Sequence, residues 1–292
     1  TDKLPVHRFR IYESGQKGRI IMRKFWKKGF TLLLGTLLAV SLIGCGSSAD
    51  GTGSTAGGSG TANIVNIGVT GSLVSFNPFV MDMSEMNHYS SGLMFLPLVE
   101  LDQNLNFVPM LADSITTEDN LTFTVHIDDA ATWSDGTPVT TADVEYTVRR
   151  LCSPVVANPY MMYYVFEGVD DETGFVEENA DSVAGIRIVD DKTITFTVKS
   201  PMSLISFENG YARYMHILPK HVIEKFSEAE LTTNEWFSHP DVVSGPYMVT
   251  DFDPEHYVSY TANTKYFKGA PKIEKLNFKI VEGSQILAGL KS

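Results

Sequence analysis

The stretch LTFTVHIDDAATWSDGTPVTTADV, residues 121–144, predicts a strand, a turn and the start of a helix in succession. In its first seven residues, apolar side chains alternate with threonine and histidine, the period-two pattern of a half-buried strand. Asp135 and Gly136 then predict a turn, and Thr140 with Asp143 has the spacing of a capping box. We therefore expect a helix from about Thr141 to Leu151.

A second strand is predicted at residues 193–198, which repeat the string TFTV found at residues 122–125. We expect these two strands to lie in one antiparallel sheet. Further strands are predicted at Ile64–Val69 and Leu276–Ile280, and a further helix is predicted to start near Pro219. This mixture of strand and helix patterns predicts an α/β fold for the body of the chain.

The amino-terminal region has the pattern of an export signal. Basic residues at 22–28 precede an apolar run at 30–43, which is shorter than the ~20 residues that a membrane-spanning helix needs. We interpret residues 22–44 as a signal peptide. Leu42-Ile-Gly-Cys45 resembles the lipobox of bacterial lipoproteins, so Cys45 is the predicted lipidation site, with an ordinary buried cysteine as the alternative.

The segments on either side of this signal have no predicted role in the fold. Residues 45–63 are rich in Gly, Ser and Thr and cannot form a core, so we expect a lipidated cysteine followed by a flexible tether. We interpret residues 1–21 as translated sequence upstream of the initiator Met22, with an unusually long basic leader as the alternative.

Charge and composition exclude several classes of function. The formal net charge is −12 although residues 1–44 are basic, so the remainder is strongly acidic and repels nucleic acid. The chain contains only two cysteines, which is too few for a disulfide scaffold, and we expect Cys152 to be a small buried apolar side chain.

No catalytic motif and no metal or cofactor motif is visible in the sequence. Nucleophile-elbow, phosphate-loop and dinucleotide patterns are absent, which predicts a protein that is not an enzyme and uses no cofactor. His216 and His221 are spaced by five residues with no Glu between them, unlike a zinc-protease pair. We interpret both as ordinary core or surface histidines. The aromatic run at residues 160–166 is typical of a core, although it could also line a pocket.

Several motifs, in this order, resemble the family 5 extracellular solute-binding proteins, which include the dipeptide and oligopeptide receptors of ABC importers. The resemblance covers nearly all of residues 64–292. The motifs that carry it are Asn77-Pro78, Val108-Pro-Met-Leu-Ala112, Phe123-Thr-Val-His-Ile127, Trp133-Ser-Asp-Gly-Thr-Pro-Val139, Asp143-Val144, Gly185-Ile186, Asp190-Asp-Lys-Thr193, Leu218-Pro-Lys-His221, Ser244-Gly-Pro-Tyr247 and Asn263-Thr-Lys-Tyr-Phe-Lys-Gly-Ala-Pro-Lys272.

The resemblance implies a class II periplasmic-binding-protein-like fold with two lobes and an extra inserted domain. It divides this chain into an amino-terminal lobe at 64–97 and 200–282, an inserted domain at 98–199, and the start of a second lobe at 283–292. Because the family sequence usually continues into that second lobe, we expect this chain to be truncated before it.

The resemblance also implies a function and a site. The expected protein is a monomeric receptor that captures peptides, delivers them to ABC permease subunits, and is lipid-anchored to the outer face of the cell membrane. A Gram-positive surface fits the long tether better than a periplasm. The candidate ligand contacts are Asp82, Met83, Ser84, Tyr160, Ser244 and Gly245.

Three alternative functions are also compatible with the sequence. Members of the family also bind nickel complexes, haem, opines and oligosaccharides, so another solute is the first alternative. A lipoprotein that signals or adheres without transport is the second. A surface hydrolase is the third, and it requires a nucleophile with its base or a set of metal ligands.

Overall fold

The computed structural model describes residues 63–281, apart from residues 72, 74, 83, 159–162 and 179. The chain divides into two units, 1–57 and 58–292, and every described residue belongs to the second. The predictions for residues 1–62, which include the lipidation site Cys45, therefore lie outside the described residues. The same holds for Met83, Tyr160 and residues 283–292.

One four-stranded sheet is built around the strand predicted at residues 121–127. Its order is β4-β5-β7-β6, and its strands are β4 (Ala112–Thr116), β5 (Thr122–Ile127), β7 (Thr193–Thr197) and β6 (Ile186–Ile188). The two TFTV strands are antiparallel neighbours, as predicted, and Phe123 pairs with Phe196. Both rings are fully buried, because the period-two pattern places alternate side chains on the core face.

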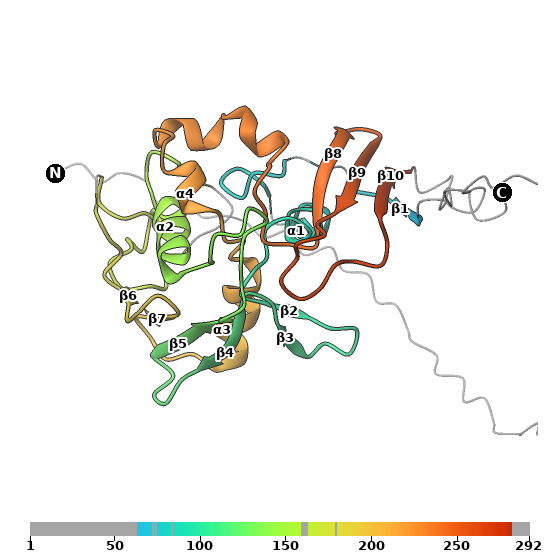
Figure 1. Cartoon of the computed structure of the whole chain (residues 1–292). Helices are drawn as coiled ribbons and strands as arrows, with labels where there is room; N and C mark the ends of the chain where they lie inside the picture. The colour runs from blue at the N-terminus through green and yellow to red at the C-terminus, as the bar shows by residue number, and fades with distance from the viewer. Residues whose placement is uncertain are drawn as a thin grey trace, which may run out of the picture. The chain divides into compact units, whose positions relative to one another are not determined.

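The other four-stranded sheet joins the two ends of the described chain. Its order is β1-β10-β9-β8, and its strands are β1 (Ile64–Val69), β10 (Lys275–Ile280), β9 (Tyr257–Ala262) and β8 (Tyr247–Asp253). Strand β1 pairs with β10 in parallel, whereas the other two pairs are antiparallel. In Figure 1 the blue β1 accordingly lies beside the red β10. Strand β1 is an edge strand of this sheet among the described residues.

Helix α2 (Thr141–Leu151) begins and ends where the sequence predicts. Asp143 accepts a hydrogen bond from the Thr140 backbone N–H at 2.9 Å, which is one half of the expected capping box. Its other oxygen accepts from the Lys220 backbone N–H at 2.9 Å. Burial raises the pKa of this carboxyl, although the hydrogen bonds oppose that effect. The cap therefore also ties α2 to helix α4 (Lys220–Ile223), which starts directly after Pro219 as predicted.

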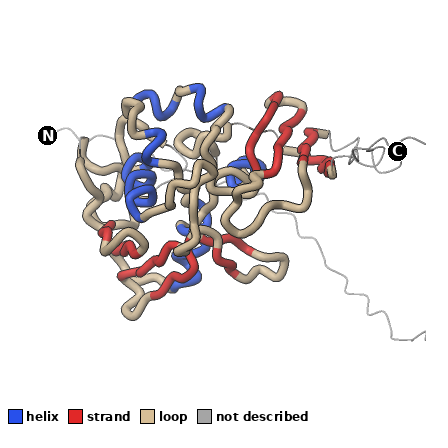
Figure 2. Tube along the Cα trace, viewed as in Figure 1, coloured by secondary structure: helices blue, strands red, loops and turns tan. Residues whose placement is uncertain are grey.

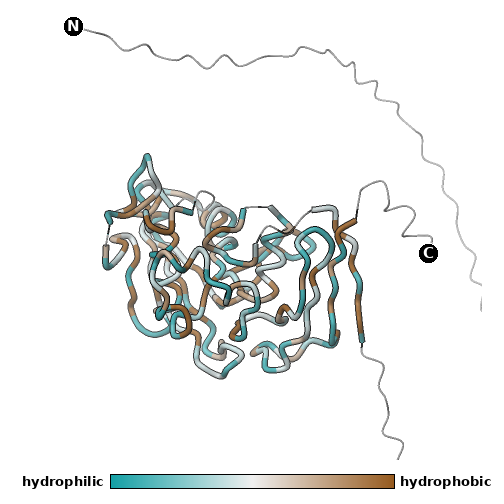
Figure 3. The backbone as a smooth tube through the Cα atoms, turned by 90° about the horizontal axis from the view of Figure 1, so that it is seen from above, coloured by the Kyte–Doolittle hydropathy of each residue, from teal (hydrophilic) through white to brown (hydrophobic). Residues whose placement is uncertain are grey.

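The remaining elements are short and are separated by long loops, as Figure 2 shows. They are strands β2 (Val99–Leu101) and β3 (Phe107–Pro109), helices α1 (Glu85–Gly92) and α3 (Leu204–Gly210), and the 3₁₀ turns η1 (Ala212–Tyr214), η2 (Ala229–Thr232) and η3 (Glu235–Ser238). Along the part of the chain that the structure describes, Figure 3 shows hydrophobic and hydrophilic residues alternating rather than forming one long apolar segment. None of the helices that the structure describes has the length and apolar character to span a membrane.

Loops carry much of the packing between distant segments. The backbone N–H of Ser134 donates to the carbonyl of Val243 at 2.8 Å, and the N–H of Val243 donates to the Ser134 hydroxyl at 3.0 Å. Next to this pair of hydrogen bonds, the Trp133 ring is fully buried. Cys152 is buried as predicted, and burial raises its pKa to about 12, so its thiol is unreactive at neutral pH.

Candidate functional site

The turn at Asn77 and Pro78 positions the first candidate residues. Asn77 is buried, and its side-chain oxygen accepts from the Phe79 backbone N–H at 3.0 Å. Its side-chain amide donates to the Leu231 carbonyl at 2.7 Å, which fixes the turn against η2. An Asn side chain that bonds its own backbone in this way stabilises a turn that no helix or strand supports. The chain leaves this turn toward Asp82 and Ser84.

Asp82 and Ser84 form the entry to helix α1. Ser84 is the N-cap residue, and its hydroxyl accepts from the Asn87 backbone N–H at 3.3 Å. One oxygen of Asp82 accepts from the Ser84 backbone N–H at 3.0 Å and from the Asn87 side-chain amide. Hydrogen bonding by Ser84, with a smaller contribution from Asn87, outweighs partial burial and lowers the pKa of Asp82. The carboxylate is therefore charged at neutral pH.

Both residues line a pocket of about 750 Å³ between strand β1 and helix α1, which we call the β1–α1 pocket. The volume lies in the range of typical small-molecule sites. The consecutive residues 67–71, from the end of β1 onward, form one wall, and Phe278 of the neighbouring strand adds to it. Met86 and Tyr89 of α1 form the opposite wall. The walls are thus mainly apolar, and carboxylates lie at the side where α1 begins.

The other predicted contacts lie elsewhere or outside the described residues. Ser244 is buried, and its hydroxyl accepts from the Leu96 backbone N–H at 3.0 Å. A Cβ atom at Gly245 would lie 2.3 Å from the Leu93 carbonyl oxygen. Both residues thus pack against the loop after α1 and do not line the β1–α1 pocket. The motif that contains them is explained by packing, and a role for Ser244 and Gly245 in ligand contact stays a prediction without structural support.

Glu85, Met86 and Tyr89 were not predicted as site residues, although helix α1 presents them to the pocket. This helix is short, and its apolar residues do not recur with the spacing of an amphipathic helix. The only local signal was Ser84, an N-cap residue followed by an acidic residue at the first helical position.

A hydrogen-bonded group of side chains connects helix α1 to β2 and to the segment at 213–216, and we call His88, Glu100, Arg213 and His216 the His88 network. His88 Nε2 lies 2.6 Å from Glu100 Oε2, and Arg213 Nε donates to Glu100 Oε1 at 2.6 Å. His88 Nδ1 lies 3.0 Å from Nε2 of His216, whose Nδ1 lies 2.8 Å from the Phe95 carbonyl oxygen. Burial would raise the pKa of Glu100, but hydrogen bonds from His88, Leu101 and Arg213 lower it to about 2.

His216 is a core histidine, which is one of the two predicted alternatives, and its fully buried ring is one end of this network. His221, by contrast, lies near the surface with Nε2 2.9 Å from Asp135. Burial and the nearby His88 lower the pKa of His216 to about 3, so the ring is neutral in the folded protein.

We expect this neutral ring to make the fold sensitive to mild acid. Between about pH 6.5 and pH 4.5 the unfolded chain binds a proton at His216, whereas the folded chain does not. Stability therefore falls as the pH falls, by up to about 1.4 kcal/mol per pH unit for one proton. The unfolding free energy, measured with urea at several pH values in this interval, should depend less steeply on pH for His216→Leu than for the natural protein. An equal dependence on pH for the two proteins would contradict the expectation.

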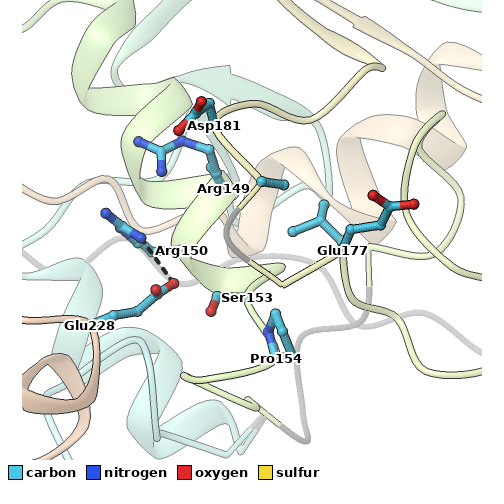
Figure 4. A pocket seen from close by; sticks show the side chains of 9 residues that line it. Arg149, Arg150, Ser153, Pro154, Glu177, Asp181 and Glu228 are labelled. Atoms are coloured by element: carbon cyan, nitrogen blue, oxygen red, sulfur yellow. Dashed lines mark ion pairs between the residues drawn. The ribbon is translucent and has the colours of Figure 1, made fainter.

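A second cavity of about 260 Å³ lies beside helix α2, where Figure 4 shows its charged lining. Its cations already have partners. Arg150 lies 2.9 Å from Glu228, and Arg149 lies 2.7 Å from Glu145 one helical turn earlier. Because each of these two arginines is already paired with a carboxylate, the cavity offers an anionic ligand little free positive charge.

Comparison with known proteins agrees with this architecture. The oligopeptide-binding protein OppA of Bacillus subtilis is 26% identical over 272 residues, which are 90% of this chain and 47% of that protein. The periplasmic oligopeptide-binding protein OppA of Escherichia coli is 28% identical over 176 residues, which are 56% of this chain and 31% of that protein. This chain thus spans less than half the length of either relative.

A solved structure shows the same fold. The Haemophilus influenzae OppA complex with the peptide RPPGFSPFR superposes with a TM-score of 0.67 at 23% identity, covering 79% of this chain and 44% of that chain. Residues 106–292 match the family described as bacterial extracellular solute-binding proteins, family 5 Middle. The family consists of extracellular receptors rather than enzymes. The chain belongs to family 5 of the bacterial extracellular solute-binding proteins, with the class II, α/β fold that its motifs predict.

Proposed function

We propose that this chain is part of a receptor that captures peptides outside the cell and delivers them to the permease of an ABC importer. The observation that carries the proposal is the β1–α1 pocket, which brings Asp82 and Ser84 to the edge of a sheet in a family of solute receptors. The names of the relatives, which are oligopeptide-binding proteins, support peptides as the ligand class.

The geometry of the pocket suits an extended peptide. Residues 67–71 belong to one wall, and β1 has only β10 beside it among the described residues. An edge strand offers main-chain donors and acceptors to another extended chain, so a peptide can add to this edge. Ile67 is 40% exposed on this wall, and a bound side chain would cover it. Met86 and Tyr89 on the opposite wall are adaptable apolar surfaces for varied side chains.

The proposal extends to the parts of the protein that surround this pocket. The sheet that contains β1 draws its strands from residues 64–69 and 247–280, and the other sheet draws its strands from 112–197. This supports an amino-terminal lobe at 64–97 and 200–282 and an inserted domain at 98–199. Cys45 would anchor the receptor to the membrane as a lipoprotein. The tether at 46–63 would hold the folded part of the receptor away from the membrane.

The test is peptide affinity, measured by calorimetry on the complete protein with defined peptides of two to nine residues. We expect Tyr89→Ala to weaken binding by about tenfold, because it removes an aromatic wall worth roughly 1–2 kcal/mol. Tyr164→Ala is the matched control, since the two tyrosines are 49% and 46% exposed and only Tyr89 lines the pocket.

The outcomes separate the two parts of the proposal. Equal peptide affinity for the Tyr89 and Tyr164 variants would show that the β1–α1 pocket is not the peptide-binding site. Failure of the natural protein to bind any peptide, together with binding of a nickel complex, haem or an oligosaccharide, would replace the ligand class.

A further inference from the structure

The protons of the His88 network can be placed from its hydrogen-bond partners, starting at the Phe95 carbonyl. A carbonyl oxygen only accepts hydrogen bonds, and it lies 2.8 Å from Nδ1 of His216. Nδ1 of His216 therefore carries a proton. The ring is fully buried with no carboxylate in direct contact, so it is neutral and its Nε2 is an acceptor.

The proton positions in the two hydrogen bonds of His88 follow from this neutral form of His216. His88 Nδ1 lies 3.0 Å from the acceptor Nε2 of His216, so Nδ1 must donate. His88 Nε2 lies 2.6 Å from a carboxylate oxygen of Glu100, which also only accepts when it is ionised. Both ring nitrogens of His88 therefore carry protons.

We infer that His88 is a buried imidazolium paired with Glu100, and that this pair is a positioning device that holds helix α1 as a wall of the β1–α1 pocket. The part of the inference that concerns the pocket rests on the proposed function. The part that concerns the proton does not.

Other proton arrangements fit the distances poorly. Reversing both histidine tautomers would point a bare Nδ1 of His216 at the Phe95 oxygen across 2.8 Å. Moving a proton from His88 to Glu100 would place it on a carboxyl group that already accepts from Arg213 Nε at 2.6 Å and from the Leu101 backbone N–H at 2.7 Å. Two donors on one carboxylate favour its charged form.

The surrounding charges balance a cation at this position. His88 is faced by Tyr89 of α1, Glu100 of β2, Tyr214 of η1 and His216, and Arg213 of η1 pairs with both Glu100 and Glu85 of α1. Arg213 and His88 are the cations, and Glu100 and Glu85 are the anions. The Tyr89 and Tyr214 rings lie 5.1 and 4.9 Å from the His88 ring, within the range of cation–π contacts.

The network reaches the pocket through helix α1. His88 is 1% exposed, whereas Glu85, Met86 and Tyr89 of the same helix line the pocket. Arg213, held by Glu100, lies 3.5 Å from Glu85 and donates to the Tyr89 hydroxyl at 3.3 Å. A His88 ring with only one proton would keep it on Nε2 for Glu100, so its bare Nδ1 would face the lone pair of His216 Nε2, and the resulting repulsion would displace α1 and Tyr89.

The proton is tested by NMR of the complete protein with ¹⁵N in its histidine rings, at neutral pH. We expect one buried histidine with protons on both nitrogens, assigned to His88 because it disappears in His88→Gln. A second ring, His216, should carry a proton only on Nδ1, with a coupling across the bond between the two rings. A bare nitrogen on His88 would overturn the inference.

The positioning role is tested by peptide affinity, measured at several pH values. We expect His88→Gln to bind peptide about tenfold more weakly than the natural protein at neutral pH, because the uncharged amide does not hold Glu100 in place as the charged ring does. His126→Gln is the control, because His126 is partly exposed beside Asp113 in the other sheet and should behave like the natural protein.

The results are distinguishable from a failure of the proposed function. If the natural protein binds no peptide, the proposed function fails while the ring protons still decide the state of His88. If peptide binds equally well to the natural protein and to His88→Gln at every pH, the positioning role is wrong although the receptor function stands.

Discussion

Replacing Gly245 by Ala should cost about 3 kcal/mol or more of unfolding free energy, which is the upper end of the range for overpacked sites. The added Cβ would lie 2.3 Å from the Leu93 oxygen and 2.7 Å from the Leu93 carbonyl carbon. These are backbone atoms, so no side chain can rotate to make room. Hydrogen bonds hold both segments, since Gly245 donates to Met94 at 2.8 Å and Tyr247 donates to Leu93 at 3.0 Å.

Urea unfolding followed by circular dichroism measures this effect. The matched control is Gly210→Ala at the end of helix α3, where an added Cβ would have no neighbour within 4 Å. Its stability should stay within about 1 kcal/mol of the natural protein, in the favourable direction. If Gly245→Ala lowers the unfolding free energy by less than about 1 kcal/mol, the loop after α1 can move to accommodate the added Cβ despite its hydrogen bonds.

Glu100→Ala is expected to be the most destabilising removal of a charge among the residues that the structure describes. Glu100 is 16% exposed and accepts from both Arg213 and His88, which are themselves almost fully buried. Removing it would leave two cations without their shared partner, and breaking a buried pair in this way costs about 3–5 kcal/mol. Thermal unfolding should report a lower Tm, by roughly 2–4 °C for each kcal/mol.

Asp113→Ala provides the comparison for this variant. Asp113 also contacts a histidine, His126 at 3.1 Å, but the two side chains are 47% and 35% exposed. Because solvent screens exposed pairs, its loss should cost no more than about 1 kcal/mol. Similar losses for the Glu100 and Asp113 variants would show that water reaches the His88 network.

The parts of the fold that the sequence predicted are those with local causes. Strands β5 and β7 follow from alternation within six residues, and helix α2 follows from a capping box whose two residues are three positions apart. Asp82 and Ser84 were predicted from the family resemblance, by their position shortly after the Asn77-Pro78 turn. In each case the residues that decide the structure are neighbours in the sequence.

The rest depends on contacts between distant residues, which no local pattern reveals. His88 and His216 are 128 residues apart, and each looks like an ordinary histidine until the fold brings them together. Ser244 was predicted at the ligand because it precedes a family motif, but its hydroxyl accepts from Leu96, 148 residues away. The polarity of a side chain does not distinguish a ligand contact from a buried hydrogen bond.

The parallel pairing of β1 with β10 constrains the order in which the protein can form. Asn66 of β1 and Asn277 of β10 share a side-chain hydrogen bond across 211 residues of sequence. The chain emerges amino terminus first, so β1 is present before its partner strand is available. The sheet of β4, β5, β6 and β7 is complete within residues 112–197 and can form before β10 emerges. Strand β1, with Ile64 and Ile67 exposed even in the finished fold, must therefore stay unpaired until the end, which makes it the segment for a chaperone to protect.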